Sequence, residues 1–233
     1  TTGDISDSGV LTITGAATFI TAQAAQDIIL DQANAFTSHV TMKAGTGGSL
    51  AFNNITFVDS DGVRLNSSAA SNGDLFIDAG TNLDVDGALI ITATTGNITQ
   101  GSELEVGTTS TFTTSASNGT ITLNDADNTF TDAVALNTDG SSGNATIKND
   151  RALLLAASTV DGTLTATATA GNITQNGVLT IGEAAKFITT TDDQSIVLGM
   201  NNVFGSHVTM QAGDGDNATF DNITFKDTNG VDL

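Results

Sequence analysis

Few residues in this chain have side chains suited to catalysis. His39 and His207 are the only histidines, and both begin the same segment, His-Val-Thr-Met. A shorter copy of the surrounding sequence has Ala133 near that position. Arg64 and Arg151 are the only arginines, and each lies beside a predicted turn, whereas a polysaccharide lyase needs a basic residue among clustered acidic metal ligands. We therefore expect surface or turn roles for the histidines and predict no catalytic, cofactor-binding or metal-binding residue.

Pairs of acidic residues raise the question of calcium. Asn82, Asp84 and Asp86 have the spacing of the first half of an EF-hand loop, but Ala93 stands where that loop needs glutamate. The other pairs lie at predicted bends: Asp59 and Asp61, Asp125 and Asp127, and Asp214 and Asp216. Asp side chains at bends commonly accept hydrogen bonds from nearby backbone amides. We expect these pairs to be turn residues and predict no cofactor, with structural calcium as the open alternative.

One line of sequence recurs along the chain. Gly96 and Gly171 both begin the segment Gly-Asn-Ile-Thr-Gln, and Gly3 begins a diverged copy. An offset of 168 relates the first copy to the third, and an offset of 75 relates the second to the third. Repetition of this kind is typical of solenoids and arrays, so we predict one elongated body that is a piece of a longer rod. Its predicted units within residues 1–233 are 3–95, 96–170 and an incomplete 171–233.

Apolar and polar residues alternate in short runs, and no helical period of comparable length occurs. The runs include Leu11 and Ile13, Ile28 and Leu30, Leu89 and Ile91, and Leu179 and Ile181. Such runs predict strands with one buried face. Gly, Asn and Asp lie between the runs, as in 59–62 and 117–119, and supply the backbone geometry of tight turns. The chain is therefore all-β and turns sharply every few residues.

The spacing of these runs predicts a solenoid. Comparable runs begin at Ile5, Ile28, Leu50, Leu75, Ile98, Ile121, Ile147, Ile173, Ile196 and Phe220. Their spacing predicts about ten coils of 22–26 residues, each coil being one circuit of three short strands. A left-handed hexapeptide solenoid would need coils of about 18 residues. We therefore predict a right-handed parallel β-helix.

Stacked coils should place equivalent residues at equivalent positions, because each coil contacts a similar coil above and below. The phenylalanines Phe19, Phe112 and Phe187, and likewise Phe36, Phe130 and Phe204, should then be internal residues of equivalent coils. The unit that begins at Gly3 should have four coils and the unit that begins at Gly96 three. The coil formed by residues 53–65 should be the one without a counterpart near residues 145–155.

Charge and composition exclude several classes of partner. Six Lys and Arg against 26 Asp and Glu give a formal net charge of -20, which repels nucleic-acid phosphates and anionic lipids. The chain has no Cys, so neither disulfides nor thiolate chemistry can occur. We predict no nucleic-acid partner and no membrane span, and the first ten residues do not resemble a signal peptide. Any export signal is therefore expected upstream of this segment.

Threonine pairs suggest an ice-binding ladder, because a flat row of threonines on a solenoid can order water. If equivalent residues stack, the three copies should all have threonine at such a position. Thr12 corresponds instead to Glu105 and Thr180, and Thr14 to Gly107 and Gly182. On this comparison the ladder is interrupted.

The repeated runs carry a family resemblance. The runs 88–100 and 162–175, both rich in Thr and ending in Gly-Asn-Ile-Thr-Gln, resemble the central repeats of filamentous-haemagglutinin-like exoproteins and other giant bacterial surface β-helix proteins. The resemblance implies a structural or adhesive rod that is extracellular or on the bacterial cell surface, with an unknown receptor and no enzymatic activity. It also leaves end-to-end or lateral self-association open. The alternative is a carbohydrate-binding or carbohydrate-cleaving β-helix, although the chain has no Trp or Tyr to stack on sugars.

Overall fold

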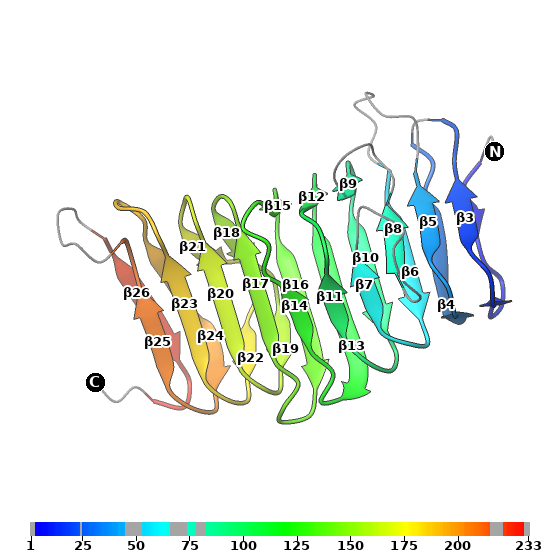
Figure 1. Ribbon diagram of the computed structural model, residues 1–233. Coiled ribbons are helices and arrows are strands. Elements are labelled where there is room, and N and C mark those ends of the chain that lie inside the picture. The colour runs from blue at the N-terminus through cyan, green and yellow to red at the C-terminus, as the bar shows by residue number, and fades with distance from the viewer. Residues whose placement is uncertain are drawn as a thin grey trace.

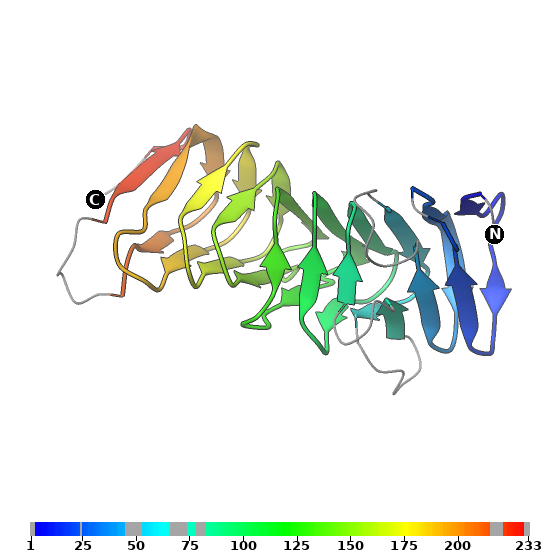
Figure 2. The same cartoon turned by 90° about the horizontal axis from the view of Figure 1, so that it is seen from above.

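The computed structural model describes residues 3–23, 25–44, 53–65, 74–77, 83–214 and 221–230. Within these residues the chain forms parallel strands and no helix. The strands lie side by side along one axis, so that the two chain ends lie at opposite ends of an elongated body (Figures 1 and 2).

The described strands form three sheets. The first sheet contains β1 (Ile5–Ser6), β2 (Thr12–Ile13), β4 (Ile28–Phe36), β6 (Ile55–Asp59), β10 (Leu89–Ala93), β13 (Ser110–Ser117), β16 (Val134–Asp139), β18 (Leu153–Leu155), β19 (Ser158–Val160), β21 (Ile173–Gln175), β22 (Leu179–Ile181), β24 (Ile196–Phe204) and β26 (Ile223–Asp227). The second sheet contains β3 (Ala17–Ile20), β5 (Val40–Lys43), β7 (Val63–Leu65), β8 (Asp74–Ile77), β11 (Ile98–Gln100), β14 (Ile121–Leu123), β17 (Ala145–Asn149), β20 (Leu164–Ala168), β23 (Ala185–Thr189) and β25 (Val208–Gln211). The third contains β9 (Leu83–Val85), β12 (Leu104–Val106) and β15 (Thr129–Phe130).

Strand pairing shows how the chain winds. After β10, β11 and β12 the chain forms β13, β14 and β15, and each of these pairs in parallel with its counterpart in the preceding coil. The next strands, β16 and β17, pair with β13 and β14 in the same way. One coil therefore contributes one strand to each of three sides, and the predicted all-β parallel β-helix is confirmed.

Coil length varies more than the sequence spacing predicted. Ala145 pairs with Leu164, 19 residues later, whereas Ile28 pairs with Ile55, 27 residues later. One coil is longer still, since Ile55 pairs with Leu89. The chain makes about eight coils, so the predicted ten were too many.

The sequence repeat and the coil do not have the same period. The equivalent strands β1 and β11 lie on different sides, because three coils lead from β1 through β4 and β6 to β10, and β11 is the next strand on. Three coils likewise lead from β11 through β14 and β17 to β20, and β21 follows. Each repeat therefore spans three coils plus one strand, and equivalent residues move to the next side of the solenoid.

This phase difference corrects two predictions. The two complete units have the same number of coils, so the expected four against three is wrong. Residues 53–65 do have a counterpart near residues 145–155, because Asp59 and Asn149 accept hydrogen bonds from the backbone amides of Phe36 and Phe130, respectively. The units differ in length mainly in the chain between β7 and β9, which spans residues 66–82, whereas only two residues separate β18 from β19.

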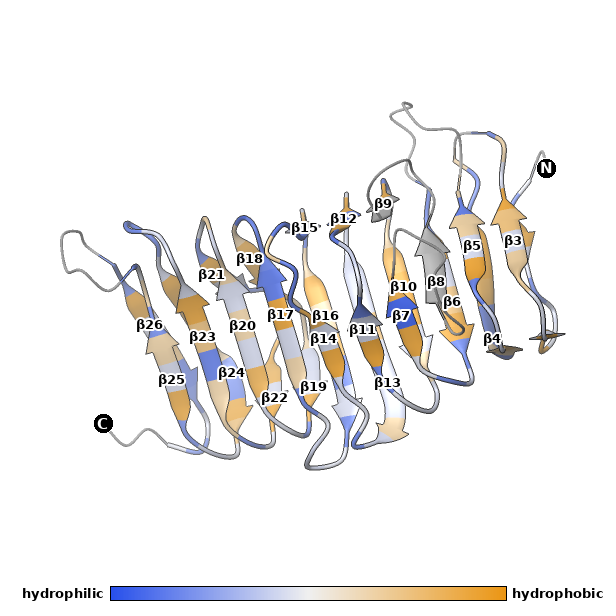
Figure 3. Ribbon diagram, viewed as in Figure 1, coloured by the Kyte–Doolittle hydropathy of each residue, from blue (hydrophilic) through white to orange (hydrophobic). Residues whose placement is uncertain are grey.

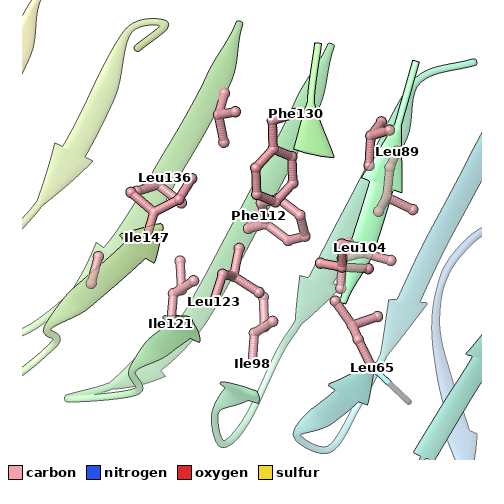
Figure 4. Close-up of a cluster of buried hydrophobic side chains, with 14 of the residues drawn as sticks. Leu65, Leu89, Ile98, Leu104, Phe112, Ile121, Leu123, Phe130, Leu136 and Ile147 are labelled. Carbon is pink, nitrogen blue, oxygen red and sulfur yellow. The ribbon is translucent and has the colours of Figure 1, made fainter. Parts of the chain in front are cut away.

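The core lies inside the coils. Alternate residues of each strand point inward, as in β10, where Leu89 and Ile91 are buried and Ile90 is 39% exposed. Phe112 packs edge-on against Phe130 with ring centroids 6.0 Å apart (Figure 4). Equivalent edge-on pairs occur in the other two units, between Phe19 and Phe36 and between Phe187 and Phe204. The predicted internal positions are confirmed for Phe112, Phe187, Phe36, Phe130 and Phe204, which are buried, and Phe19 is partly buried.

Candidate functional site: the outer face of the second sheet

The two histidines occupy equivalent positions in loops that precede a strand. The carbonyl oxygens of His39 and His207 accept hydrogen bonds from the backbone amides of Ala17 and Ala185, both at 3.1 Å. Ala133 makes the same bond in the middle unit, at 3.0 Å. The backbone therefore uses this position identically whether or not an imidazole is present, and both histidines lie in loops, as predicted.

Of the acidic pairs, Asp125 and Asp127 lie in a loop, whereas Asp59 is the last residue of β6 and Asp84 lies within β9, so the predicted turn role is wrong for these two residues. The Asp125 carboxylate accepts a hydrogen bond from the backbone amide of Asp127 at 3.1 Å. Asp59 is buried, whereas its partner Asp61 is exposed. Asn82 and Asp216, which belonged to two of the proposed pairs, lie outside the described residues. Within the described part of the chain no group of three or more His, Cys, Asp or Glu residues could hold a metal ion.

A set of buried asparagines was not predicted from the sequence. Asn34, Asn128 and Asn202 are fully buried at the corner between two strands or within a bent strand. The Asn128 Oδ1 accepts a hydrogen bond from the Leu104 amide at 2.9 Å, while its Nδ2 donates to the carbonyl of Lys148 at 3.2 Å. One side chain thus links three successive coils.

The same asparagine in each unit pairs with a second polar side chain. The Nδ2 of Asn34 donates to Asp7 Oδ2 at 2.7 Å, and the amides of Asn128 and Asn202 donate to Gln100 and Gln175 at 3.1 and 2.9 Å. A sequence signal was present, because each asparagine stands two residues before one of the recurring phenylalanines in an Asn-x-Phe triplet. These side chains replace backbone hydrogen bonds that the chain cannot make where it changes direction.

A second recurrent position holds a buried carboxyl group. Asp59 is 2% exposed, and burial raises its pKa, although hydrogen bonds from the backbone amides of Phe36, Asp61 and Ser60 partly offset the effect. Asn149 occupies the equivalent position of the middle unit and both accepts from the Phe130 amide at 2.8 Å and donates to the Phe130 carbonyl at 3.1 Å. A neutral amide thus makes the hydrogen bonds required at the same corner without burying a charge.

The strands β11, β14, β17, β20, β23 and β25 present a flat outer surface that we call the lysine–threonine face. Pairing aligns its first row across successive coils, in the order Thr99, Thr122, Thr146, Thr165, Lys186 and Thr209. A second row follows in the order Lys148, Thr167, Ile188 and Gln211. These side chains are half-buried or exposed. Each is partly covered by the side chains of the coils above and below it.

The first row corrects the ice-binding comparison. That comparison assumed that Thr12, Glu105 and Thr180 stack, but Thr12 pairs with Ala35 and Thr180 pairs with Thr159 and Val203. Threonines from non-equivalent repeat positions stack instead, and four of them adjoin without interruption on the lysine–threonine face. The ladder therefore exists on a side of the molecule where the sequence comparison could not find it.

Charge separates the lysine–threonine face from the rest of the surface. None of its six strands contains Asp or Glu, although the chain has 26 acidic residues, because the carboxylates are concentrated in the loops. Lys148 and Lys186 project from β17, which is coloured mainly as hydrophilic, and from β23, which has both hydrophilic and hydrophobic colouring (Figure 3). The only ion pair among the described residues joins Arg151 to Asp150 at 2.9 Å. Both lysines of the face are therefore free of carboxylate partners within the described chain.

A hollow is present at the far end of the described coils. It is lined by core-facing side chains that include Phe204, Met210, Ile223 and Phe225, together with His207. Phe204 and Phe225 lie with ring centroids 5.3 Å apart. The hollow is the inner surface of the last described coil and continues the hydrophobic core.

The repeats match one known family over most of the chain. Its profile, described as repeats of unknown function (DUF5649), covers residues 1–43, 73–137 and 142–211. The chain belongs to this family. The matched DUF5649 segments end at Lys43 and Gln211, the last residues of β5 and β25, and at Asn137, within the equivalent strand β16, so the family repeat agrees with the repeat found in the sequence. No curated protein and no solved structure matches the chain.

Proposed function

We propose that this chain is a segment of a structural and adhesive rod displayed outside a bacterial cell, with no catalytic role. The observation that carries the proposal is the continuous parallel stacking of strands from β1 to β26 along one axis. Such a stack is a rigid spacer, because every coil is held to the next by backbone hydrogen bonds and a shared core.

The sequence pattern supports an extracellular setting. The chain resembles the central repeats of filamentous-haemagglutinin-like surface proteins in its Thr-rich strands and Gly-Asn-Ile-Thr-Gln loops, and it has no Cys that an oxidising environment could modify. Within the described residues no helix is long and apolar enough to span a membrane. The receptor would be a surface molecule of a host or neighbouring cell.

Two measurements test the proposal. Antibodies raised against this chain should label the surface of intact source cells, and labelling only after lysis would contradict the extracellular location. Beads coated with the chain should resist detachment by flow over a cell layer better than beads coated with serum albumin. Equal detachment would contradict adhesion and leave only the structural role.

Carbohydrate binding is a second candidate function, favoured by the hydroxyl and amine groups aligned on the lysine–threonine face. A flat row of donors and acceptors at strand spacing, about 4.8 Å, suits an extended polymer. A groove lined with aromatic and basic residues would distinguish a carbohydrate-binding β-helix, and this face has the basic residues without the aromatic ones. Retention of the chain on immobilised neutral and acidic polysaccharides would test this function, with loss of retention expected for Thr122→Val combined with Thr146→Val.

A further inference from the structure

The lysine–threonine face is a flat surface whose cations have no carboxylate partner within the described chain. We propose that it packs side by side against the acidic loops of a second copy of this chain. The inference concerns assembly of the rods, and it stands whether or not the rod is adhesive.

The lysines are placed to meet an acidic partner. Lys186 lies in the first row beside Thr165, and Lys148 lies in the second row beside Thr167. Neither side chain forms a hydrogen bond or ion pair within the described residues, and their strands contain no carboxylate. An anionic surface that approaches this face would gain attraction without displacing an existing ion pair.

The same chain presents a suitable anionic surface. Glu103 lies in the loop after β11, and Asp125 and Asp127 lie in the loop after β14, one coil further along. A hydrogen bond holds the second loop against the end of β11, because the Asp125 amide donates to Gln100 Oε1 at 3.2 Å. Asp127 is exposed, and Glu103 and Asp125 are half-buried. We call these three residues the acidic ridge, and none of them forms an ion pair within the described chain.

The charges of the two surfaces are spaced along the same axis in whole coils of about 4.8 Å. Lys148 and Lys186 lie two coils apart, and Glu103 and Asp125 lie one coil apart, so two rods lying side by side can bring a lysine of one copy against a carboxylate of the other. A net charge of -20 on each copy opposes most encounters. Repulsion elsewhere therefore selects the orientation in which the lysine–threonine face of one copy meets the acidic ridge of the other.

This contact uses two different surfaces of the chain, so it is heterologous. Each copy can engage one neighbour through its face and another through its ridge, and a contact of this type does not close by itself. We therefore expect association that grows with concentration beyond a dimer, and that weakens with salt because exposed charges are screened within about 8 Å at physiological ionic strength.

Charge variants of the whole chain, followed by sedimentation velocity over a range of concentrations, test the proposal. Lys148→Glu with Lys186→Glu, the face variant, reverses the positive charge of the lysine–threonine face. Glu103→Lys with Asp125→Lys and Asp127→Lys, the ridge variant, reverses the negative charge of the acidic ridge. Each variant alone should associate roughly tenfold more weakly than the unaltered chain, as expected when a few exposed ion pairs are lost. The matched control, Lys43→Glu with Lys226→Glu, changes the charge equally outside the face and should associate about as well as the unaltered chain.

Mixing the two variants gives the decisive result. The face variant still has its ridge and the ridge variant still has its face, so the mixture should form one-to-one complexes that grow no further. A milder pair, Lys148→Gln with Lys186→Gln, repeats the test without reversing charge, and thermal melts confirm that each variant is folded. The proposal is overturned if the unaltered chain stays monomeric, if the control is impaired as much as the face variant, or if the mixture forms no complex. Binding of the unaltered monomer to an acidic polysaccharide alone would point to a glycan as the occupant and would also overturn it.

Discussion

At the residue scale, polar side chains at the corners of the solenoid take over hydrogen bonds that the backbone makes along straight strands. The Asn128 side chain accepts a hydrogen bond from the Leu104 amide of the preceding coil and donates one to the Lys148 carbonyl of the next coil. Asp59 and Asn149 serve a neighbouring corner, one as a carboxyl group and the other as an amide. The carboxyl group is the less suitable of the two, because burial in a low dielectric disfavours its charged form.

Asp59→Asn should therefore stabilise the protein at neutral pH, by roughly 0.5–1.5 kcal/mol in the free energy of unfolding. The folded state holds the Asp59 proton more tightly than the unfolded state, since its folded pKa is raised. The wild-type chain thus gains stability as the pH falls through that raised pKa, and the advantage of the variant should shrink below it. Urea unfolding of the two proteins at neutral and at mildly acidic pH measures the difference in the free energy of unfolding and its dependence on pH.

The exposed neighbour provides the control for this substitution. Asp61→Asn should change the free energy of unfolding by less than about 0.5 kcal/mol, because its side chain is exposed. If Asp59→Asn instead destabilises the protein at neutral pH, the charged hydrogen bond to Phe36 outweighs the cost of burying the carboxylate.

At the element scale, loops of successive coils lie in close contact, and some positions leave no room for a side chain. Gly177, in the loop before β22, faces the loop between β18 and β19, and a Cβ there would overlap the backbone nitrogen of Ala157. The equivalent position of the middle unit holds Ser102. The steric limit at Gly177 therefore belongs to this coil and not to the repeat position as such.

Gly177→Ala should destabilise the protein by about 1–3 kcal/mol, because the loops of two coils must move apart. Gly199→Ala is the matched substitution within β24, where the nearest atom to the added Cβ would be a Thr224 methyl group at 3.9 Å. That variant should be neutral or slightly stabilising, since alanine loses less conformational freedom than glycine on folding. Thermal unfolding of both compares them directly, and equal losses would show that contact between loops does not limit the Gly177 position.

At the scale of the whole molecule, most carboxylates lie in the loops, and the strands of the lysine–threonine face contain none. A formal net charge of -20 is distributed along the loops of the stacked coils, so neighbouring loops repel each other. Several carboxylates in these loops already accept hydrogen bonds from backbone amides. Asp27, for example, accepts one from the Asn54 amide at 2.8 Å. Diffuse screening should therefore relieve the repulsion without a bound metal ion.

Sodium chloride should accordingly raise the melting temperature, and calcium chloride of equal ionic strength should give the same curve. Scanning calorimetry in the two salts, with a chelator-treated sample as the reference, makes the comparison. A higher melting temperature in calcium than in matched sodium chloride would reveal specific calcium sites and would contradict the prediction of no cofactor.

The sequence by itself determined the local structure. Alternating residues such as Leu89 and Ile91 specify which face of a strand is buried, and the recurring phenylalanines identify the core, because both depend on neighbours close in the chain. The loop position of His39 and His207 followed in the same way. The buried asparagines could have been found from their Asn-x-Phe triplets, but nothing local shows that an asparagine faces inward.

Only the tertiary structure decided which residues stack. Strand pairing shows that coil length varies, from the 19 residues between Ala145 and Leu164 to the 34 between Ile55 and Leu89. A repeat counted along the chain therefore does not count coils, and three coils plus one strand rotate each unit onto a new side. For this reason the threonine row and the lysine–threonine face arise from non-equivalent repeat positions, which no comparison between copies could align.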